Sequence, residues 1–247
     1  MDTSAYQNFA KEKLGFEFNN IDLLVVALTH RSYVNEHKKA HLKHNERLEY
    51  LGDAVLELVT SDFLYRNYEE PEGIMTAWRA ALVRTESISD AGYKLGYEPL
   101  VRLSRGEQHG ISRAHAIIIA DCFEAVIGAI YLDQGYDTAK DFIYKHILSK
   151  INEILEEESW RDPKSYFQEL AQKYEFETPV YRTLKEDGPD HNKTFTVAAY
   201  VGKSIIASAT GHSKQEAQTL AANRASNSTN KNTNPQNDQN LLTTNSL

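Results

Sequence analysis

NERLEYLGDAVL, residues 45–56, contains three carboxylates, Glu46, Glu49 and Asp53, separated by three and then four residues. That spacing places all three side chains on one face of an α-helix. Leucine, valine and phenylalanine recur at helical intervals as far as residue 63, so the stretch predicts a helix from about Glu46 to Tyr68. Acids that share one helix face repel each other, so this face needs cations or solvent beside it.

A second pair of acids, Asp121 and Glu124, repeats the three-residue spacing within IIIADCFEAVIGAIYL, residues 117–132. The segment predicts one of the most apolar helices of the chain, so we expect both carboxylates to lose part of their hydration. A buried charge is costly without a partner. Arg47 stands beside the first acids, but no Lys or Arg lies between Asp121 and Asp133.

Spacing alone leaves two interpretations of these five acids open. They are either paired with cations in a structural core, or they hold a divalent ion. A set of oxygen ligands without His or Cys favours Mg²⁺, with Mn²⁺ as a substitute, over zinc or copper. Neither segment contains the Glu-x-x-His pair of helical di-iron sites.

The chain divides into two domains and a tail. Residues 1–158 repeat helical periodicity without strand-like alternation and predict an all-α domain, with helices near 76–83, 88–95, 116–133 and 138–157. Residues 159–226 predict a small α+β domain of order α-β-β-β-α. Its first helix starts at Asp162-Pro163, its strands span 180–185, 194–200 and 203–210, and Ser213 caps a last helix over 214–224. The polar residues 227–247 predict a disordered tail.

The net charge of −8 argues against a nucleic-acid partner when it is averaged over the chain. The charge is unevenly distributed, however. Residues 1–160 hold 17 basic and 26 acidic residues, whereas residues 161–226 hold nine and eight. The acid excess therefore belongs to the first domain, where a bound divalent ion would reverse the sign that a phosphate meets.

Several classes of function are excluded by what the sequence lacks. Its single cysteine, Cys122, excludes an internal disulfide and a thiolate zinc cluster, and we expect it to fill core volume. Neither a membrane-length apolar run nor a secretory signal is visible, so we expect a cytoplasmic protein without a membrane partner. No glycine motif for phosphate binding occurs, so no nucleotide cofactor is expected. His37, His41 and His44 recur at helical spacing, and we expect them to be solvated near an anionic substrate instead of binding a metal.

Residues 45–56 closely resemble the signature helix of bacterial ribonuclease III, NERLEFLGDAVL, and differ only in Tyr50 for Phe. Further matching segments follow in the family's order: Glu72-Gly73, Arg79-Ala-Ala-Leu-Val and residues 120–133. The second domain resembles a double-stranded-RNA-binding domain, with Gly188-Pro-Asp-His191, Lys193-Thr-Phe195 and Ser213-Lys214-x-Glu216-Ala217. The resemblance covers roughly residues 5–226.

The resemblance implies a homodimeric endonuclease that cuts double-stranded RNA. It implies that Glu49, Asp53, Asp121 and Glu124 bind the metal, and that Glu46 and Glu72 help to shape the catalytic cleft. It places Tyr50 and Gly52 at the dimer interface. The products would carry 5′-phosphate and 3′-hydroxyl ends with short 3′ overhangs, and ribosomal-RNA precursors and mRNA are the expected substrates.

The resemblance also implies three RNA contacts in the second domain. Ser165, Gln168 and Glu169 would meet one minor groove, His191 a second one, and Ser213 and Lys214 the phosphates between them. Many relatives carry two lysines at 214 and 215, but this chain has Gln215, which predicts a weaker affinity with a flatter salt dependence.

Two other functions would use the same two domains differently. A catalytically silent protein would bind double-stranded RNA and use its first domain only to dimerise. A metal-dependent phosphohydrolase of small substrates would leave the second domain unexplained. Cleavage of a long RNA duplex with and without Mg²⁺ distinguishes all three.

Overall fold

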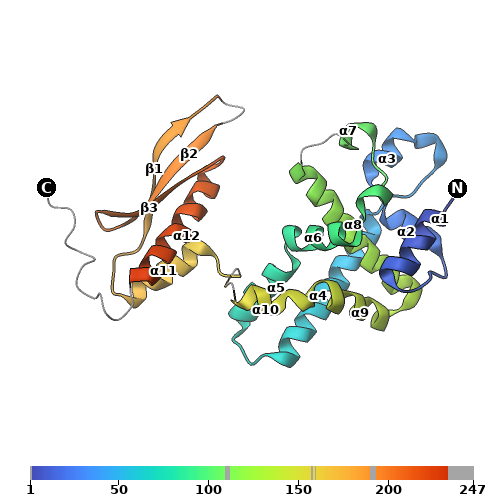
Figure 1. The fold of residues 1–247 in the computed structure, drawn as a ribbon, viewed down its shortest axis with the longest axis horizontal. Helices are drawn as coiled ribbons and strands as arrows, with labels where there is room; N and C mark the ends of the chain where they lie inside the picture. The colour runs from blue at the N-terminus through green and yellow to red at the C-terminus, as the bar shows by residue number, and fades with distance from the viewer. Residues whose placement is uncertain (1, 109–111, 157, 159, 190–192, 233–247) are drawn as a thin grey trace. The chain divides into compact units, whose positions relative to one another are not determined.

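The structure is a computed structural model that describes residues 2–108, 112–156, 158, 160–189 and 193–232 (Figure 1). The chain forms two compact units, Met1–Trp160 and Arg161–Leu247. The first unit ends two residues later than predicted because Trp160 packs edge-on against Trp78, with ring centroids 6.0 Å apart.

The first unit is helical in its described part, as predicted. Its α-helices are α1 (Ser4–Phe9), α2 (Ile21–Ala27), α3 (Arg31–Glu36), α4 (Glu46–Asn67), α5 (Glu72–Val83), α6 (Thr85–Leu95), α7 (Arg105–Gln108), α8 (Ser112–Gln134), α9 (Tyr136–His146) and α10 (Ile151–Glu156). Short turns connect some of them: a π-helical turn η1 (Ala10–Leu14) and the 3₁₀ turns η2 (Lys38–Ala40), η3 (Glu98–Leu100) and η4 (Leu148–Lys150).

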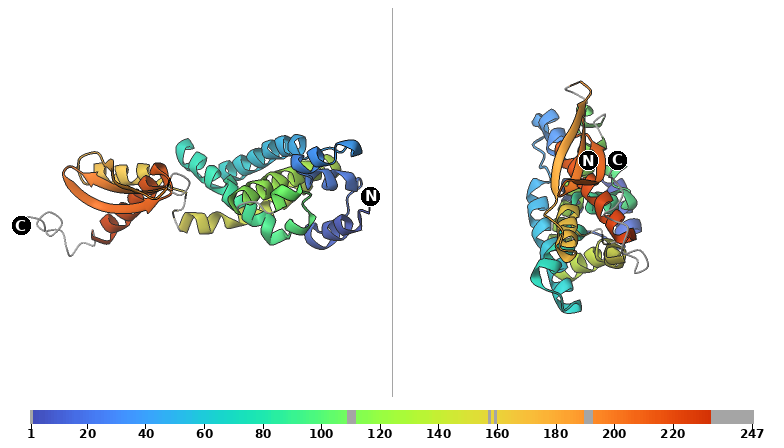
Figure 2. Two further views of the ribbon diagram at one scale, coloured as in Figure 1. Left: turned by 90° about the horizontal axis from the view of Figure 1, so that it is seen from above. Right: turned by 90° about the vertical axis from the view of Figure 1, so that its left-hand side faces the viewer.

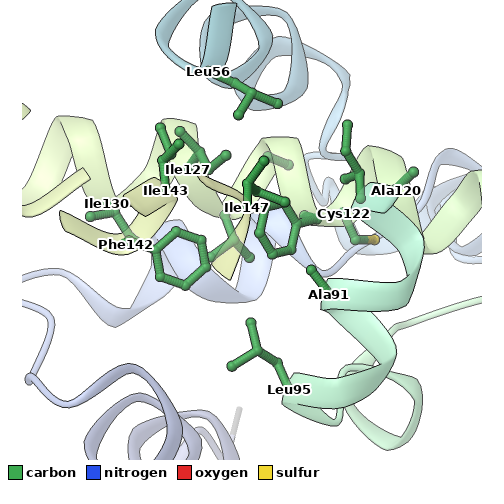
Figure 3. Close-up of a cluster of buried hydrophobic side chains, with 14 of the residues drawn as sticks. Leu56, Ala91, Leu95, Ala120, Cys122, Ile127, Ile130, Phe142, Ile143 and Ile147 are labelled. Atoms are coloured by element: carbon green, nitrogen blue, oxygen red, sulfur yellow. The ribbon is translucent and has the colours of Figure 1, made fainter. Parts of the chain in front are cut away.

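Helix α8 is the centre of this unit, and α4 runs along it (Figure 2). Its buried side chains meet those of α6 and α9 and Leu56 of α4 in one apolar core (Figure 3). Cys122 is fully buried there, which confirms its predicted place in the core. Residues Ala114–Gln134 are long and apolar enough to cross a membrane, but most of this segment is buried inside the unit, as expected of a core helix.

The predicted helix over 138–157 is wrong as one element. It is interrupted between α9 and α10 by the turn η4. The interruption places Lys150 against α6, where its ammonium group donates to the Ser87 carbonyl and to the Asp90 carboxylate at 3.1 and 2.9 Å. Sequence periodicity does not reveal this tertiary contact, which accompanies the break in the helix.

The second unit has the predicted order α-β-β-β-α: α11 (Pro163–Lys173), β1 (Val180–Asp187), β2 (Thr194–Val201), β3 (Ser204–Gly211) and α12 (Lys214–Asn232). The strands form an antiparallel sheet of order β1-β2-β3, with a register shift in each pair. Helix α12 packs against β2, β3 and α11 through alanines, and Phe167 of α11 is buried in the same core.

The last helix does not end at residue 224 as predicted, but continues to Asn232, past the predicted domain boundary at residue 226. Within this extension the hydroxyls of Ser226, Ser228 and Thr229 each donate to the carbonyl four residues earlier, at 3.0, 2.9 and 2.9 Å, so these polar side chains bond within the helix. The polar composition from residue 227 therefore does not exclude a helix here. The rest of the predicted tail, residues 233–247, lies outside the described residues.

Candidate active site and nucleic-acid interface

Helices α4 and α8 cross with their backbones in contact at Gly52 and Gly128. A Cβ atom on Gly52 would lie 1.7 Å from the carbonyl oxygen of Glu124, and one on Gly128 would lie 2.3 Å from that of Leu48. Any side chain at either position would force the helices apart. This contact brings together the four side chains that form the acid cluster: Glu49, Asp53, Asp121 and Glu124.

The raised pKa values of Glu49, Asp121 and Glu124 show that these three carboxylates are partly desolvated and lie near other negative charges. Burial, followed by the charges of Asp53, Asp121 and Glu49, raises the pKa of Glu124 to about 8. Burial, followed by Asp121, Glu46 and Asp53, raises the pKa of Glu49 to about 7. The pKa of Asp121 is raised by burial and by Glu46.

The described residues supply no salt bridge to any member of the acid cluster. Of the two interpretations that spacing leaves open, the salt-bridged core is therefore disfavoured. Within the same residues, no three His, Cys, Asp or Glu side chains converge closely enough to hold an ion. The cluster thus has the composition of a site for a hard cation, but no three of its described carboxylates lie close enough together to coordinate one ion.

A cavity of about 420 Å³ opens beside the acid cluster, lined by His30, Arg31, Asn45, Glu46, Glu49 and Asp121. Glu46 lies at its edge, with Arg31 Nη1 at 3.4 Å and His44 Nδ1 at 3.8 Å. Asn45 is buried; its backbone N–H donates to the Thr29 carbonyl at 2.9 Å and its amide to Cys122 Sγ at 3.6 Å. These bonds fix the start of α4 against the segment that follows α2 and against α8.

One acid at this site escapes the sequence analysis. Glu57 follows Asp53 by four residues on α4, and its charge contributes to the raised pKa of Glu124. Its carboxylate is paired with Arg79 Nε of α5 at 2.9 Å. The helical spacing of Glu46, Glu49 and Asp53 extends to Glu57, so the same pattern could have found it.

Glu72 is the predicted acid that the structure does not bring to the cluster. It is exposed at the first residue of α5, and its carboxylate accepts a hydrogen bond from the Thr76 hydroxyl at 3.2 Å. It does not contribute to the raised pKa values of Glu49, Asp121 or Glu124. Its cleft role therefore rests on the resemblance alone.

The three upstream histidines do not share a helix, despite their spacing. His37 ends α3 and stacks on Tyr33 with ring centroids 4.1 Å apart, whereas His41 has a left-handed backbone with φ 47°. His44 adjoins Glu46, and nothing gathers the three as metal ligands among the described residues.

An exposed apolar stripe lies beside the acid face of α4. Tyr50, Leu58 and Tyr65 are 82, 58 and 78% exposed. Gly52 does not belong to this stripe, because it is buried against α8 of the same chain, and the α4–α8 crossing requires its missing side chain. Its place at a dimer interface stays a prediction.

In the second unit, the predicted RNA contacts of α11 are exposed. Ser165, Gln168 and Glu169 lie in its first two turns. The predicted cap is confirmed, because the Asp162 carboxylate accepts from both the backbone N–H and the hydroxyl of Ser165 at 2.9 Å. His191 lies outside the described residues.

The start of α12 is capped on both sides. The Ser213 hydroxyl accepts from the Glu216 N–H at 3.0 Å, and the Glu216 carboxylate accepts from the His212 N–H at 2.7 Å. The bond to the Ser213 hydroxyl confirms the predicted cap, and the glutamate reaches the N–H of the residue before the cap, one position earlier than in a capping box. This arrangement leaves Lys214 exposed, with its ammonium group 2.7 Å from Glu186 of β1.

Comparison with known proteins agrees with both units. Residues 20–151 match the family model described as Ribonuclease-III-like, and residues 163–228 match the double-stranded RNA binding motif. Ribonuclease 3 from Oceanobacillus iheyensis is 43% identical over 89% of this chain and 96% of its own length. Ribonuclease 3 from Latilactobacillus sakei is 43% identical over 87% of this chain and 94% of its own length. The solved nuclease domain of ribonuclease III from Campylobacter jejuni is 34% identical, with a TM-score of 0.48, and covers 56% of this chain and 96% of that one.

The fold and these matches define a two-domain endoribonuclease for double-stranded RNA, in which a helical nuclease domain precedes an RNA-binding domain. The chain belongs to the ribonuclease III family. The resemblance drawn from the signature helix is thereby confirmed.

Proposed function

We propose that this protein cleaves double-stranded RNA by metal-dependent phosphodiester hydrolysis at the acid cluster, and that Mg²⁺ is the metal. The observation that carries the proposal is a set of four carboxylates on crossing helices, three of them partly buried and Asp53 exposed, without a salt bridge from the described residues. Oxygen-only donors suit Mg²⁺, and Mn²⁺ has the same preference.

The proposed ligands are Glu49, Asp53, Asp121 and Glu124. Both glutamates have rotatable side chains that could bring their carboxylates onto an ion while the glycine contact keeps the helix backbones in place. Divalent ions held there would activate a water molecule and stabilise the charge that develops on the phosphate. Deprotonation of Glu49 and Glu124 would accompany metal binding, since their pKa values are about 7 and 8 in the metal-free chain.

Residues beside the cluster would position the RNA strand. Glu46 would hold Arg31 at the rim of the cavity, where a guanidinium group can meet a phosphate. Asp53 and Glu124 would lie closest to the reacting phosphate in this scheme, while Glu46, with Glu72 by resemblance, would shape the cleft. In-line attack by water would leave a 5′-phosphate and a 3′-hydroxyl.

The proposal includes a homodimer formed through the exposed stripe of α4. Tyr50, Leu58 and Tyr65 are the kind of aromatic and aliphatic residues that protein interfaces bury. Two copies would give one acid cluster per RNA strand and cuts with short 3′ overhangs. Leu58→Asp should then yield a monomer in light scattering, whereas Leu132→Asp, an exposed apolar position on α8, should leave the dimer intact.

We also propose ribosomal-RNA precursors and mRNA in the cytoplasm as the substrates, on the ground of the resemblance to ribonuclease III.

The test is to incubate a long RNA duplex with the full chain, with Mg²⁺ and with EDTA. We expect short duplex products only with Mg²⁺, and a 5′-phosphate-dependent exonuclease should degrade them after strand separation. Duplex binding without cutting in Mg²⁺ would instead favour a silent RNA-binding protein. Hydrolysis of small phosphate esters without duplex cleavage would favour a phosphohydrolase.

A further inference from the structure

Three charged side chains meet at one corner of the second unit, where β1 ends and β2 and α12 begin. Glu186 of β1 lies between two lysines: its Oε1 is 2.7 Å from Lys214 Nζ, and its Oε2 is 3.4 Å from Lys193 Nζ. Each carboxylate oxygen thus has its own ammonium group. The lysines come from segments about 20 residues apart in sequence, and strand pairing brings them together.

Sheet register and an aromatic ring hold this corner in place. Phe195 of β2 is the direct partner of Glu186 across the antiparallel pair. Both ammonium groups also lie over the Phe195 ring, Lys214 at 5.4 Å and Lys193 at 6.0 Å from its centroid. The hydrogen bond from Lys214 lowers the pKa of Glu186, so its carboxylate is charged at neutral pH.

A carboxylate bridging two lysines resembles an RNA phosphate in charge and in its oxygen acceptors. A phosphate that approaches the start of α12 must therefore compete with Glu186 for the same ammonium groups. The exchange replaces two ion pairs with others of the same kind, so little electrostatic free energy is gained from it.

We propose, building on RNA binding by this domain, that Glu186 is an intramolecular competitor of the RNA phosphate and limits the affinity of the Lys193–Lys214 pair for duplex RNA. Both lysines are at least one-third exposed, so the pair is within reach of a ligand in the free protein. Glu186 thereby makes RNA binding weaker and less dependent on salt than the number of lysines would predict.

The competitor role predicts the effect of removing the charge. In Glu186→Gln neither ammonium group is paired with a carboxylate at residue 186, so no ion pair must break before the lysines bind a phosphate. Duplex affinity should therefore rise about 2- to 10-fold at 150 mM salt, the range expected for two exposed ion pairs. The slope of log affinity against log salt should become more negative by roughly 1, because one more phosphate is neutralised. Glu186→Ala should act in the same direction.

Glu177→Gln is the matched control. It removes the same unit of charge from the same unit of the protein, but Glu177 precedes the opposite end of β1, roughly 20 Å away along the strand. Charges that far apart are largely screened at 150 mM salt. Its affinity and salt slope should therefore equal those of the wild type.

The measurement is fluorescence anisotropy of a labelled 30-base-pair RNA duplex with the full chain in EDTA, from 50 to 300 mM KCl. Circular dichroism verifies that both Glu186 variants fold. Unchanged affinity in the folded variants overturns the proposal, and weaker binding shows that Glu186 instead positions the lysines for RNA. In both of these outcomes the wild-type chain still binds the duplex, so the proposed function stands. A wild-type chain that does not bind the duplex at all overturns the proposed function, and this inference with it.

Discussion

The acid cluster and the start of α12 arrange charge in opposite ways. In the first, four carboxylates share one helix crossing without a salt bridge from the described residues, and two have pKa values of about 7 and 8. In the second, a single carboxylate serves two ammonium groups. Like charges in a partly buried site repel each other until a cation binds between them. Exposed ion pairs contribute little free energy, so another anion can replace one partner.

The two regions also differ in what holds the charges in place. The acid cluster depends on backbone contact between helices, which leaves no room for a side chain at Gly52 or Gly128. The lysines of the second unit depend on strand register and on long flexible side chains. A substitution should therefore have a large, all-or-none effect in the first region and a graded one in the second.

The largest effect is expected for Glu124→Gln, which removes one proposed metal ligand. Single-turnover cleavage of a duplex in Mg²⁺ should slow by about 10³-fold or more, since a metal ion supplies several kcal/mol of charge stabilisation in the transition state. Duplex affinity in EDTA should stay within about 3-fold of wild type. Glu153→Gln, at an exposed position of α10, is the control. Cleavage by Glu124→Gln at a near wild-type rate would remove this residue from the site.

Gly52→Ala tests the backbone contact. Its Cβ would lie 1.7 Å from the Glu124 carbonyl oxygen, so the helices must separate, and the free energy of unfolding should fall by about 3 kcal/mol or more. Urea denaturation measures this. Gly73→Ala is the matched control, because a Cβ there meets nothing within 4 Å. Alanine is the better helix former, so that variant should gain up to about 1 kcal/mol. Equal stability of the two variants would contradict the close crossing.

A smaller effect should appear in the pH dependence of stability without metal. Glu49 and Glu124 lose their protons with pKa values of about 7 and 8 in the folded chain, whereas in the unfolded chain they lose them near the ordinary pKa of 4.5. The folded state thus binds more protons between these limits, and the free energy of unfolding falls as pH rises from about 5 to about 8. After discounting for solvent screening, the fall should be on the order of 2 kcal/mol.

Urea denaturation in EDTA at several pH values measures that fall. A Glu49→Gln/Glu124→Gln double variant should give a flatter profile, and Mg²⁺ should restore stability mainly at high pH, where the carboxylates are charged. A double variant with the wild-type profile would assign the pH dependence to other groups.

Local patterns in the sequence predict the helical acids and both capped helices, because each depends on residues within one or two turns. Asp121 and Glu124 are one turn apart, and the Ser213 hydroxyl accepts from the Glu216 N–H three residues later. What sequence misses depends on distant contacts. The sequence does not reveal that Gly52 is packed against α8 of the same chain. The break before α10 comes with a contact of Lys150 with α6, and the pairing of Lys214 with Glu186 depends on sheet register.

The smallest effect is expected for Gln215→Lys, which restores the second lysine of many relatives at an exposed position of α12. One further cation should strengthen duplex binding by about 2- to 5-fold at 150 mM salt and make the salt slope more negative by up to about 0.9. Gln215→Glu should act in the opposite direction by a similar factor, which separates charge from side-chain length. Fluorescence anisotropy in EDTA measures both.

If Glu186 limits the lysines already present, combining Gln215→Lys with Glu186→Gln should increase affinity by more than either change alone, because no carboxylate remains to compete with the phosphate. Equal affinities for the Lys and Glu variants would place position 215 outside the RNA contact.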